Sequence, residues 1–351
     1  MKKIFILPLL VCANAAFAVD GVILGGVAKS DDMYGAVAAT DATNESSFFE
    51  ALKRVRKNCM GISDELGDIR KLVGVSAATA AGGTLTAAGA AYVGGDKMEA
   101  DEKIKKIKSL YSELENAQPD SSGQIISIPD GLELKLMQLI DFEKVASAKN
   151  SVNSAKLELE SEEAKLKKKS KLYGNVRTGL MATSTAANIA SAVVSGTNAN
   201  SFNAQLSARI GACLGAVNYL SKAKVQAGLD GTATNQDVAK AEKIIETCGK
   251  YNADDVLKLV KQARGASAVS GIGAATGLAG TITSATANSN KIRDAQSEEA
   301  QKKEKNLNTA SNVLATATTV ASLTSSVLNV AQLSAAARVI ELAEQCEEAL
   351  K

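Results

Sequence analysis

The residues of this sequence best suited to chemistry are its cysteines. Five are present, and one of them, Cys12, lies in an N-terminal leader. The other four, Cys59, Cys213, Cys248 and Cys346, form an even set, which in an exported chain favours disulfide bonds. Each also occupies an apolar helical stripe, where a buried free thiol packs well. Because the sequence has no Cys-x-x-Cys pair, we do not expect a redox-active site.

Residues 1–18 have the pattern of a cleaved signal peptide. A basic start is followed by an apolar run over residues 4–11 and by Ala16-Phe17-Ala18 at the expected cleavage point. The apolar run is too short to cross a hydrocarbon core of about 30 Å. We therefore expect export to the periplasm, the cell surface or the extracellular space.

The composition excludes most catalytic and metal-binding chemistry. There is no His, so His-based acid–base catalysis, most hydrolytic triads and His-ligated metals are not available. There is no Trp, and aromatic residues make up only 3% of the chain, which leaves little material for a large ligand pocket. The sequence therefore predicts no enzyme, no cofactor, no metal site and no small-molecule substrate.

The charge balance argues against nucleic acid as a partner. Without Lys2 and Lys3 of the leader, the chain carries 38 basic and 38 acidic residues, because the full sequence has 40 and 38. A nucleic-acid binder needs a basic excess. We expect an unknown protein partner or self-association, with membrane contact as the less favoured case.

Two motifs have a simpler structural explanation. The segment Gly271–Gly277 resembles a dinucleotide-binding glycine pattern, but that pattern needs a preceding strand and Val256–Arg264 reads as helix. The charged run Glu158–Lys171 could dock to an anionic surface. It is more typical of a solvated helix face with pairs such as Glu163–Lys167.

Four long stretches without any charge dominate the organisation of the chain. They consist largely of Ala, Gly, Ser and Thr, and they alternate with charged helical sequence. The stretches are Leu72–Gly95, Thr178–Ala208, Gly265–Asn290 and Asn306–Ala337. Such small side chains allow two helices to approach closely, in water or in lipid.

The sequence predicts an all-α fold, an elongated antiparallel helical bundle with coiled-coil-like hairpins. Residues 19–46 form a loose N-terminal arm, residues 47–227 a first hairpin with a loop at about 118–131, and residues 235–351 a second hairpin. Apolar residues at spacings of three and four mark the expected contact faces. On three helices these are Leu52, Val55, Cys59, Ile62, Leu66, Ile69 and Val73; Val176, Leu180, Thr183, Ala187, Ala190 and Val194; and Val313, Val320, Leu323, Val327 and Val330.

The two hairpins resemble each other, which suggests an internal duplication. Lys71-Leu72-Val73 follows Cys59 much as Lys258-Leu259-Val260 follows Cys248. Distances from the Gly231 turn favour Cys213–Cys248 and Cys59–Cys346 as the disulfides. The duplication favours the alternative, Cys59–Cys213 with Cys248–Cys346.

Two functions fit these features. The favoured one is an exported structural or interaction protein, a disulfide-tied bundle without a catalytic site. The alternative is a membrane-active protein, pore-forming or membrane-inserting, that uses its Gly/Ala-rich hairpins within a bilayer. Magnitude favours the first, since Gly265–Asn290 has only four large apolar residues, which together contribute about 2 kcal/mol to insertion.

Overall fold

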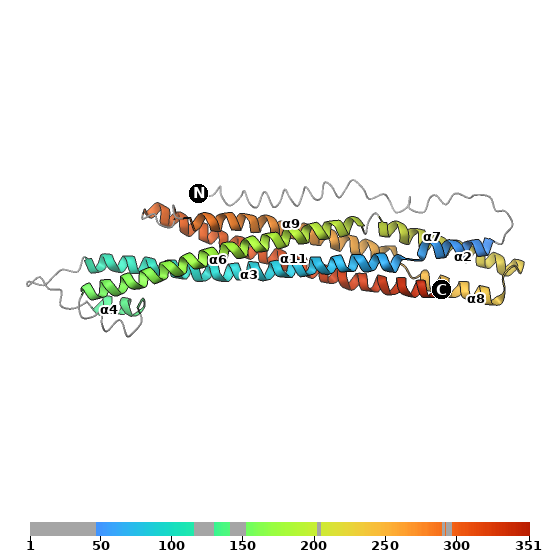
Figure 1. Ribbon diagram of the computed structural model, residues 1–351, viewed down its shortest axis with the longest axis horizontal. Coiled ribbons are helices and arrows are strands. Elements are labelled where there is room, and N and C mark those ends of the chain that lie inside the picture. Colours follow the sequence, from blue (N-terminus) through green and yellow to red (C-terminus); the bar gives the residue numbers. More distant parts are fainter. Residues whose placement is uncertain (1–46, 116–129, 141–151, 202–204, 290–291, 293–296) are drawn as a thin grey trace, which may run out of the picture. The chain divides into compact units, whose positions relative to one another are not determined.

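The computed structural model of the chain describes residues 47–115, 130–140, 152–201, 205–289, 292 and 297–351 (Figure 1). These residues form an all-α helical bundle, as the sequence predicts, and no strand occurs among them. The expected signal peptide (1–18) and N-terminal arm (19–46) lie outside the described residues. So does most of the expected loop at 118–131, whose last two residues instead begin a helix.

Eight helices are seen in the described part of the chain. In order they are α2 (Ser47–Cys59), α3 (Ile62–Glu115), α4 (Asp130–Met137), α6 (Val152–Ser201), α7 (Ser207–Asp230), α8 (Asn235–Cys248), α9 (Ala253–Ala287) and α11 (Glu298–Ala349).

Two glycines explain the sharpest turns. Gly61, between α2 and α3, has φ +82°, and Gly231, which ends α7, has φ +65°. Both lie in the left-handed region that glycine adopts without a steric penalty. Thr234 then caps α8, accepting from the backbone N–H of Asp237 while the Asp237 carboxylate accepts from the Thr234 N–H. The turn at Gly231 predicts a helix cap at Thr234 or Asn235, and this capping box shows that Thr234 is the cap.

Other helix boundaries differ partly from expectation. The helix expected to run on from Asn235 is divided after Cys248, and α9 begins only at Ala253. The pair Gly94-Gly95 followed by Asp96 predicts a kink or break in the helix, but α3 runs through it without interruption. The polar stretch Asn198–Asn203 predicts a break before Leu206, but residues 202–204 lie outside the described residues; α6 is described to Ser201 and α7 begins at Ser207.

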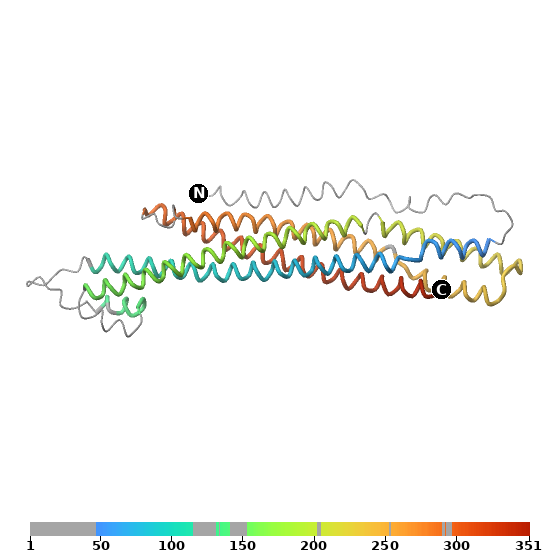
Figure 2. Tube along the Cα trace, viewed as in Figure 1, coloured from blue at the N-terminus to red at the C-terminus, as the bar shows by residue number. Residues whose placement is uncertain are grey.

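The chain divides into two compact units. Unit 1 comprises residues 1–84, 185–276 and 318–351, and unit 2 comprises 85–184 and 277–317. Helices α3, α6, α9 and α11 contribute residues to both units, and Figure 2 allows each to be followed along the chain by its colour. Each unit is described below by itself.

Unit 1 contains a conventional apolar core around the cysteines, which we call the disulfide pole. Its fully buried members include Phe48, Val55, Ile62, Leu66 and Leu220. All four cysteine side chains are completely buried in the same cluster. Burying apolar surface of this kind stabilises a fold by about 25 cal/mol per Å².

The disulfides in the structure are Cys59–Cys213 and Cys248–Cys346. The pairing favoured by distance from the Gly231 turn, Cys213–Cys248 with Cys59–Cys346, is therefore wrong, and the alternative suggested by the duplication is the one found. Cys59 ends α2, which packs on α7 of the same hairpin, and the Cys248 sulfur lies 3.7 Å from the Cys346 carbonyl oxygen of α11. Each bond closes its own hairpin.

Unit 2 has a smaller apolar core at the end of α3 and the start of α6. Ile107, Leu110 and Leu114 of α3 pack there with Leu159 of α6 and with Leu136 of α4. This core lies outside the uncharged stretches. The short helix α4, which the sequence had not predicted, covers it.

We predict that the two disulfides stabilise the fold independently. Replacing Cys59 and Cys213 together by Ala should lower the free energy of unfolding by about 2–5 kcal/mol, because the unfolded chain loses a constraint over a long loop. Chemical unfolding of the variant measures this. Peptide mapping without reductant should recover Cys59 linked to Cys213, and a peptide linking Cys59 to Cys346 would contradict the structure.

Candidate functional site: a polar seam within the uncharged helices

One unbroken stripe of buried residues runs along α11. Starting from Cys346 in the disulfide pole, the buried positions recur at alternating spacings of three and four back to Asn308. They are Cys346, Ala343, Val339, Ala336, Gln332, Asn329, Ser325, Ser322, Thr318, Ala315, Ser311 and Asn308. This is a strict heptad repeat, the pattern of a helix packed in a coiled-coil manner.

The other three long helices bury equivalent stripes within their uncharged stretches. These are Val73, Ser76, Ala80, Gly83, Ala87, Ala90 and Gly94 of α3; Met181, Ser184, Asn188, Ser191, Ser195 and Asn198 of α6; and Ala266, Ser270, Gly273, Gly277, Gly280, Ser284 and Ala287 of α9. Together with residues 308–332 of the α11 stripe we call them the polar seam. Its members are almost all glycine, alanine, hydroxyl or amide residues.

On α6 and α11 many of the large apolar residues face outward, which corrects the contact faces expected there, whereas the face expected from Leu52 to Val73 is confirmed. On α11, Val313, Val320 and Val327 are 53%, 59% and 60% exposed. On α6, Thr183 and Ala190 are exposed while Ser184 and Ser191, next to them, are buried. The remaining exposed large residues of the four stretches are Leu72, Val75, Leu85, Tyr92, Ile189, Val193, Leu278, Ile282, Leu323 and Val330.

A closed ring of hydrogen bonds explains why hydroxyls occupy the interior of unit 1. Its members come from all four long helices and are Ser76, Ser191, Ser195, Ser270, Ser325 and Asn329. The six contacts between neighbours measure 2.5 to 3.5 Å. All six residues are fully buried. Each hydroxyl thus has a partner without water, which removes most of the cost of burying it.

Glycines leave room for a second polar layer beside this ring. The Asn188 side-chain N–H donates to the Ser322 hydroxyl over 2.8 Å, and the Thr276 and Thr318 hydroxyls lie 2.9 Å apart. A Cβ atom at Gly273 would come within 2.8 Å of Asn188 Oδ1. A larger residue at Gly273 would displace this amide, so the layer requires glycine there.

Hydroxyls on the outer face are satisfied by their own helices. Thr79, Thr183, Thr197, Thr316 and Thr324 each donate to the backbone carbonyl four residues earlier, at 2.9 to 3.0 Å. Threonine bonded in this way needs no water partner. The outer face is therefore less polar than its threonine content suggests.

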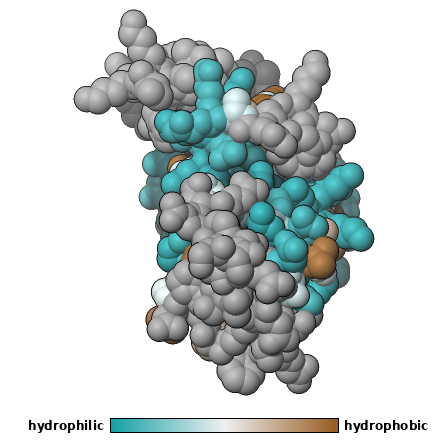
Figure 3. All heavy atoms as spheres, turned by 90° about the vertical axis from the view of Figure 1, so that its left-hand side faces the viewer, coloured by the Kyte–Doolittle hydropathy of each residue, from teal (hydrophilic) through white to brown (hydrophobic). Residues whose placement is uncertain are grey.

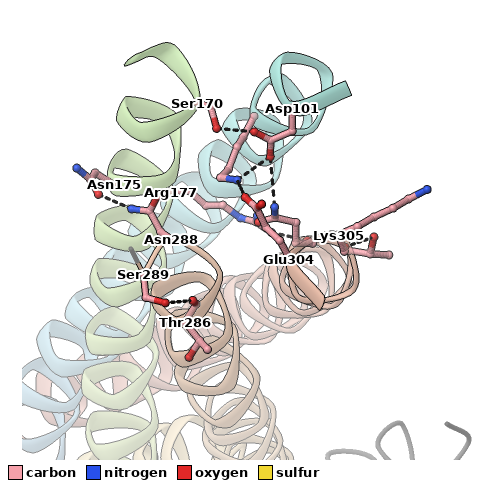
Figure 4. A network of polar contacts seen from close by, with 12 residues as sticks. Asp101, Ser170, Asn175, Arg177, Thr286, Asn288, Ser289, Glu304 and Lys305 are labelled. Atoms are coloured by element: carbon pink, nitrogen blue, oxygen red, sulfur yellow. Dashed lines mark hydrogen bonds and ion pairs between the residues drawn. The ribbon is translucent and has the colours of Figure 1, made fainter. Parts of the chain in front are cut away.

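Unit 2 holds a buried ionic cluster next to its part of the seam (Figure 4). Lys97, 1% exposed, lies 2.7 Å from Asp101 and 3.2 Å from Glu304. Asp101 also accepts from the Ser170 hydroxyl at 2.6 Å and from the Asn308 amide at 3.4 Å. The cluster joins α3, α6 and α11 by charge-assisted bonds, which are stronger than neutral ones.

Arg177 of α6 is buried near this cluster without a carboxylate partner. Its Nη2 donates to the backbone carbonyl of Asn308 at 3.2 Å, whereas Nε and Nη1 have no partner among the described residues. A Cβ at Gly94 would approach Arg177 Nε to 3.0 Å and Asn312 Oδ1, also unpartnered, to 2.1 Å. The guanidinium therefore packs directly on Gly94, with the Asn312 acceptor beside it.

Charged surface flanks the uncharged stretches of unit 2. Glu163–Lys167 is a 2.8 Å ion pair on α6, as expected, with Lys167 exposed and Glu163 only 14% exposed, and Lys103–Glu99 is another pair on α3. Figure 3 views unit 2 from the side of α4, where the surface of the described residues is predominantly hydrophilic. Exposed pairs of this kind add little stability and favour contact with water.

Two helical stretches of the described chain are long and apolar enough to cross a membrane. They are Ser47–Leu114 and Glu298–Ala349, and only 28% and 33% of their most apolar windows is buried within the protein.

Comparison with protein-family models, curated protein sequences and solved structures found no match for this chain. The site therefore rests on its own geometry. Sequence reasoning missed the polar seam because it followed the bulkiest residues. Steps of three and four from Cys346 would have located it.

We predict that Gly273 and Gly271 of α9 respond oppositely to substitution. Gly271 has nothing within 4 Å of an added Cβ, so Gly271→Ala should raise the free energy of unfolding by about 1 kcal/mol through helix propensity. Gly273→Leu should lower it by about 1–3 kcal/mol because it overpacks the seam. Chemical unfolding measures both. Equal effects at both positions would contradict the assignment of the buried face.

We predict a pH signature for Glu304, which precedes the uncharged stretch of α11. Burial raises the pKa of Glu304, Lys97 opposes this rise and Asp101 adds to it. A raised pKa in the folded state means that ionised Glu304 destabilises the fold, and the penalty is relieved as the pH falls through that pKa. The stability of Glu304→Gln relative to the unmodified protein should therefore decline as the pH falls from about 8 to about 4.

Denaturant unfolding at several pH values measures this difference. Glu298→Gln is the control, because Glu298 is 81% exposed and its relative stability should stay nearly constant. A Glu304→Gln variant that gains relative stability as the pH falls would contradict the assignment.

Proposed function

We propose that this protein is membrane-active, and that its four uncharged helical stretches insert into a lipid bilayer together. The observation that supports this most directly is their polarity. Hydroxyl and amide side chains lie between the helices, and many of the large apolar residues, such as Val320 and Val327, face outward. Such an arrangement suits a surrounding of acyl chains, with small and polar residues at the helix contacts.

The contrast with the disulfide pole supports the same proposal. In the disulfide pole the buried face of each helix carries large apolar residues, as expected for a protein in water. The change to small and polar residues on the buried face begins where the uncharged stretches begin. Charged residues resume beyond the other end of each stretch, for example at Lys97 and Glu304. A bilayer core matches a charge-free length bounded on both sides by charge.

The energetic objection drawn from Gly265–Asn290 weakens once the helices are assembled. Its buried hydroxyls, Ser270, Thr276 and Ser284, bond to partners on neighbouring helices instead of facing lipid. Its outward threonines Thr283 and Thr286 bond to their own helix. If the stretches insert as a bundle, little polar surface faces lipid, so the insertion free energy of the few large apolar residues is opposed by only a small desolvation cost.

We predict that a charge on the outer face impairs insertion. Val327→Lys should lower the partition coefficient of the protein into vesicles about a hundredfold, because a lysine at the centre of a membrane helix costs about 2.5–3.5 kcal/mol. Flotation with liposomes and dye leakage both measure the effect.

Val225→Lys is the matched control. Val225 is 59% exposed, like Val327 at 60%, but it lies on α7 outside the uncharged stretches. It should leave binding unchanged. Equal vesicle binding by the two variants would refute the proposal. So would an unmodified protein that neither binds vesicles nor releases their dye.

A structural or interaction role is the second candidate, and the disulfide pole favours it. Two buried disulfides and a continuous apolar core make a rigid platform that has no evident part in bilayer insertion. In an exported protein such a platform would serve to display a binding surface. This role alone predicts that vesicles are ignored by the protein.

A further inference from the structure

An open groove of about 990 Å³ lies on the disulfide pole of unit 1. One wall is α2, the other is α8, and the last residues of α11 close it. None of these residues belongs to the uncharged stretches or to the polar seam. The groove is therefore a feature that the membrane proposal does not use.

The lining residues of each wall share one face of their helix. On α2 the lining residues Phe49, Leu52, Lys53 and Arg56 follow spacings of three and four, so they share one face. On α8, Lys240 and Ile244 do the same. Both helices are tied at their C-terminal ends by disulfides, through Cys59 and Cys248. The walls are thus held by covalent links into the core.

The charge in the groove is predominantly positive. Arg56 and Lys243 form no ion pair in the described structure. The lining has five basic and three acidic residues: Glu50 lies 4.0 Å from Lys53, Asp237 is occupied by the cap at Thr234, and Glu348 lies at the α11 end. Free cations along both walls therefore face an incoming partner.

The floor of the groove offers apolar anchors. Phe49 is 51% exposed, although it is the kind of residue usually buried, and its ring meets that of Phe48 edge-on at 5.4 Å. Leu52 and Ile244 lie beside it in the lining. Aromatic residues and arginine are enriched at protein-binding surfaces.

We propose that this groove docks an acidic amphipathic segment of a partner protein. Carboxylates of the segment pair with Arg56 and Lys243, and its apolar face covers Phe49. A groove lined by two helices fits the helix-in-groove mode of recognition. Charge complementarity selects an acidic partner and excludes a basic one. The inference is independent of membrane insertion.

The test uses a synthetic helical peptide of about 18 residues with leucine at helical spacing and glutamate elsewhere. Its counterpart carries lysine for every glutamate. Fluorescence anisotropy with the full chain should show binding of the acidic peptide only, weakened between about 50 mM and about 300 mM salt. The pair Arg56→Glu and Lys243→Glu should reduce affinity roughly tenfold or more, and Phe49→Ala should reduce it without changing the salt dependence.

The double variant Lys57→Glu and Lys222→Glu is the matched control, since both lysines are exposed and neither lines the groove. This variant carries the same charge change and should bind like the unmodified protein. No binding up to about 1 mM peptide would overturn the proposal, as would equal binding of both peptides or equal losses in the two charge variants. Vesicles of phosphatidylglycerol form a further arm. If the groove variants lose vesicle binding while the peptide never binds, the groove serves lipid and the proposal fails.

Discussion

The constraint on which this structure depends is the narrow space between the long helices. Where Gly83, Gly273 and Gly280 lie, a single added Cβ would come within 3.4 Å of a neighbouring side chain. Backbones this close admit only small side chains at the buried heptad positions. The chain must therefore place its larger residues elsewhere, and within the uncharged stretches the only other place is the outer face.

Small side chains alone bury too little area to hold four helices together, so polar bonds contribute the rest. The hydroxyl ring through Ser76 and Ser270 links all four helices in unit 1, and the ionic cluster at Lys97 links three in unit 2. The buried heptad stripe of α11 thus begins at the disulfide-bonded Cys346, continues through hydroxyl and amide residues, and ends at Asn308, which bonds the Asp101 carboxylate. Polar bonds of this type strengthen as water is excluded, which is the condition that a bilayer provides.

The sequence was sufficient for the fold class and for several local features, because these depend on neighbours along the chain. The Thr234 cap and the left-handed Gly231 follow from residue type and spacing. The inward face of the uncharged helices could not be found from bulk, since valines spaced by seven and serines spaced by seven predict the same period. The disulfide pairing depended on which cysteines the fold brings together, and spacing along the chain does not determine this. The left-handed Gly61 that separates α2 from α3 was not predicted either. The groove at Phe49 and Arg56 brings together residues from helices far apart in sequence, so only the fold could reveal it.

The orientation of the uncharged helices is tested most directly by photolabelling in the bilayer. Phospholipids with a photoreactive group at the end of the acyl chain label the residues they touch, and mass spectrometry locates the label. The account predicts adducts on Val320, Leu323 and Val327, which are 54–60% exposed, and none on the buried Ser322 and Ser325 of the same helical turns. Adducts on the serines, or a pattern without helical period, would contradict it.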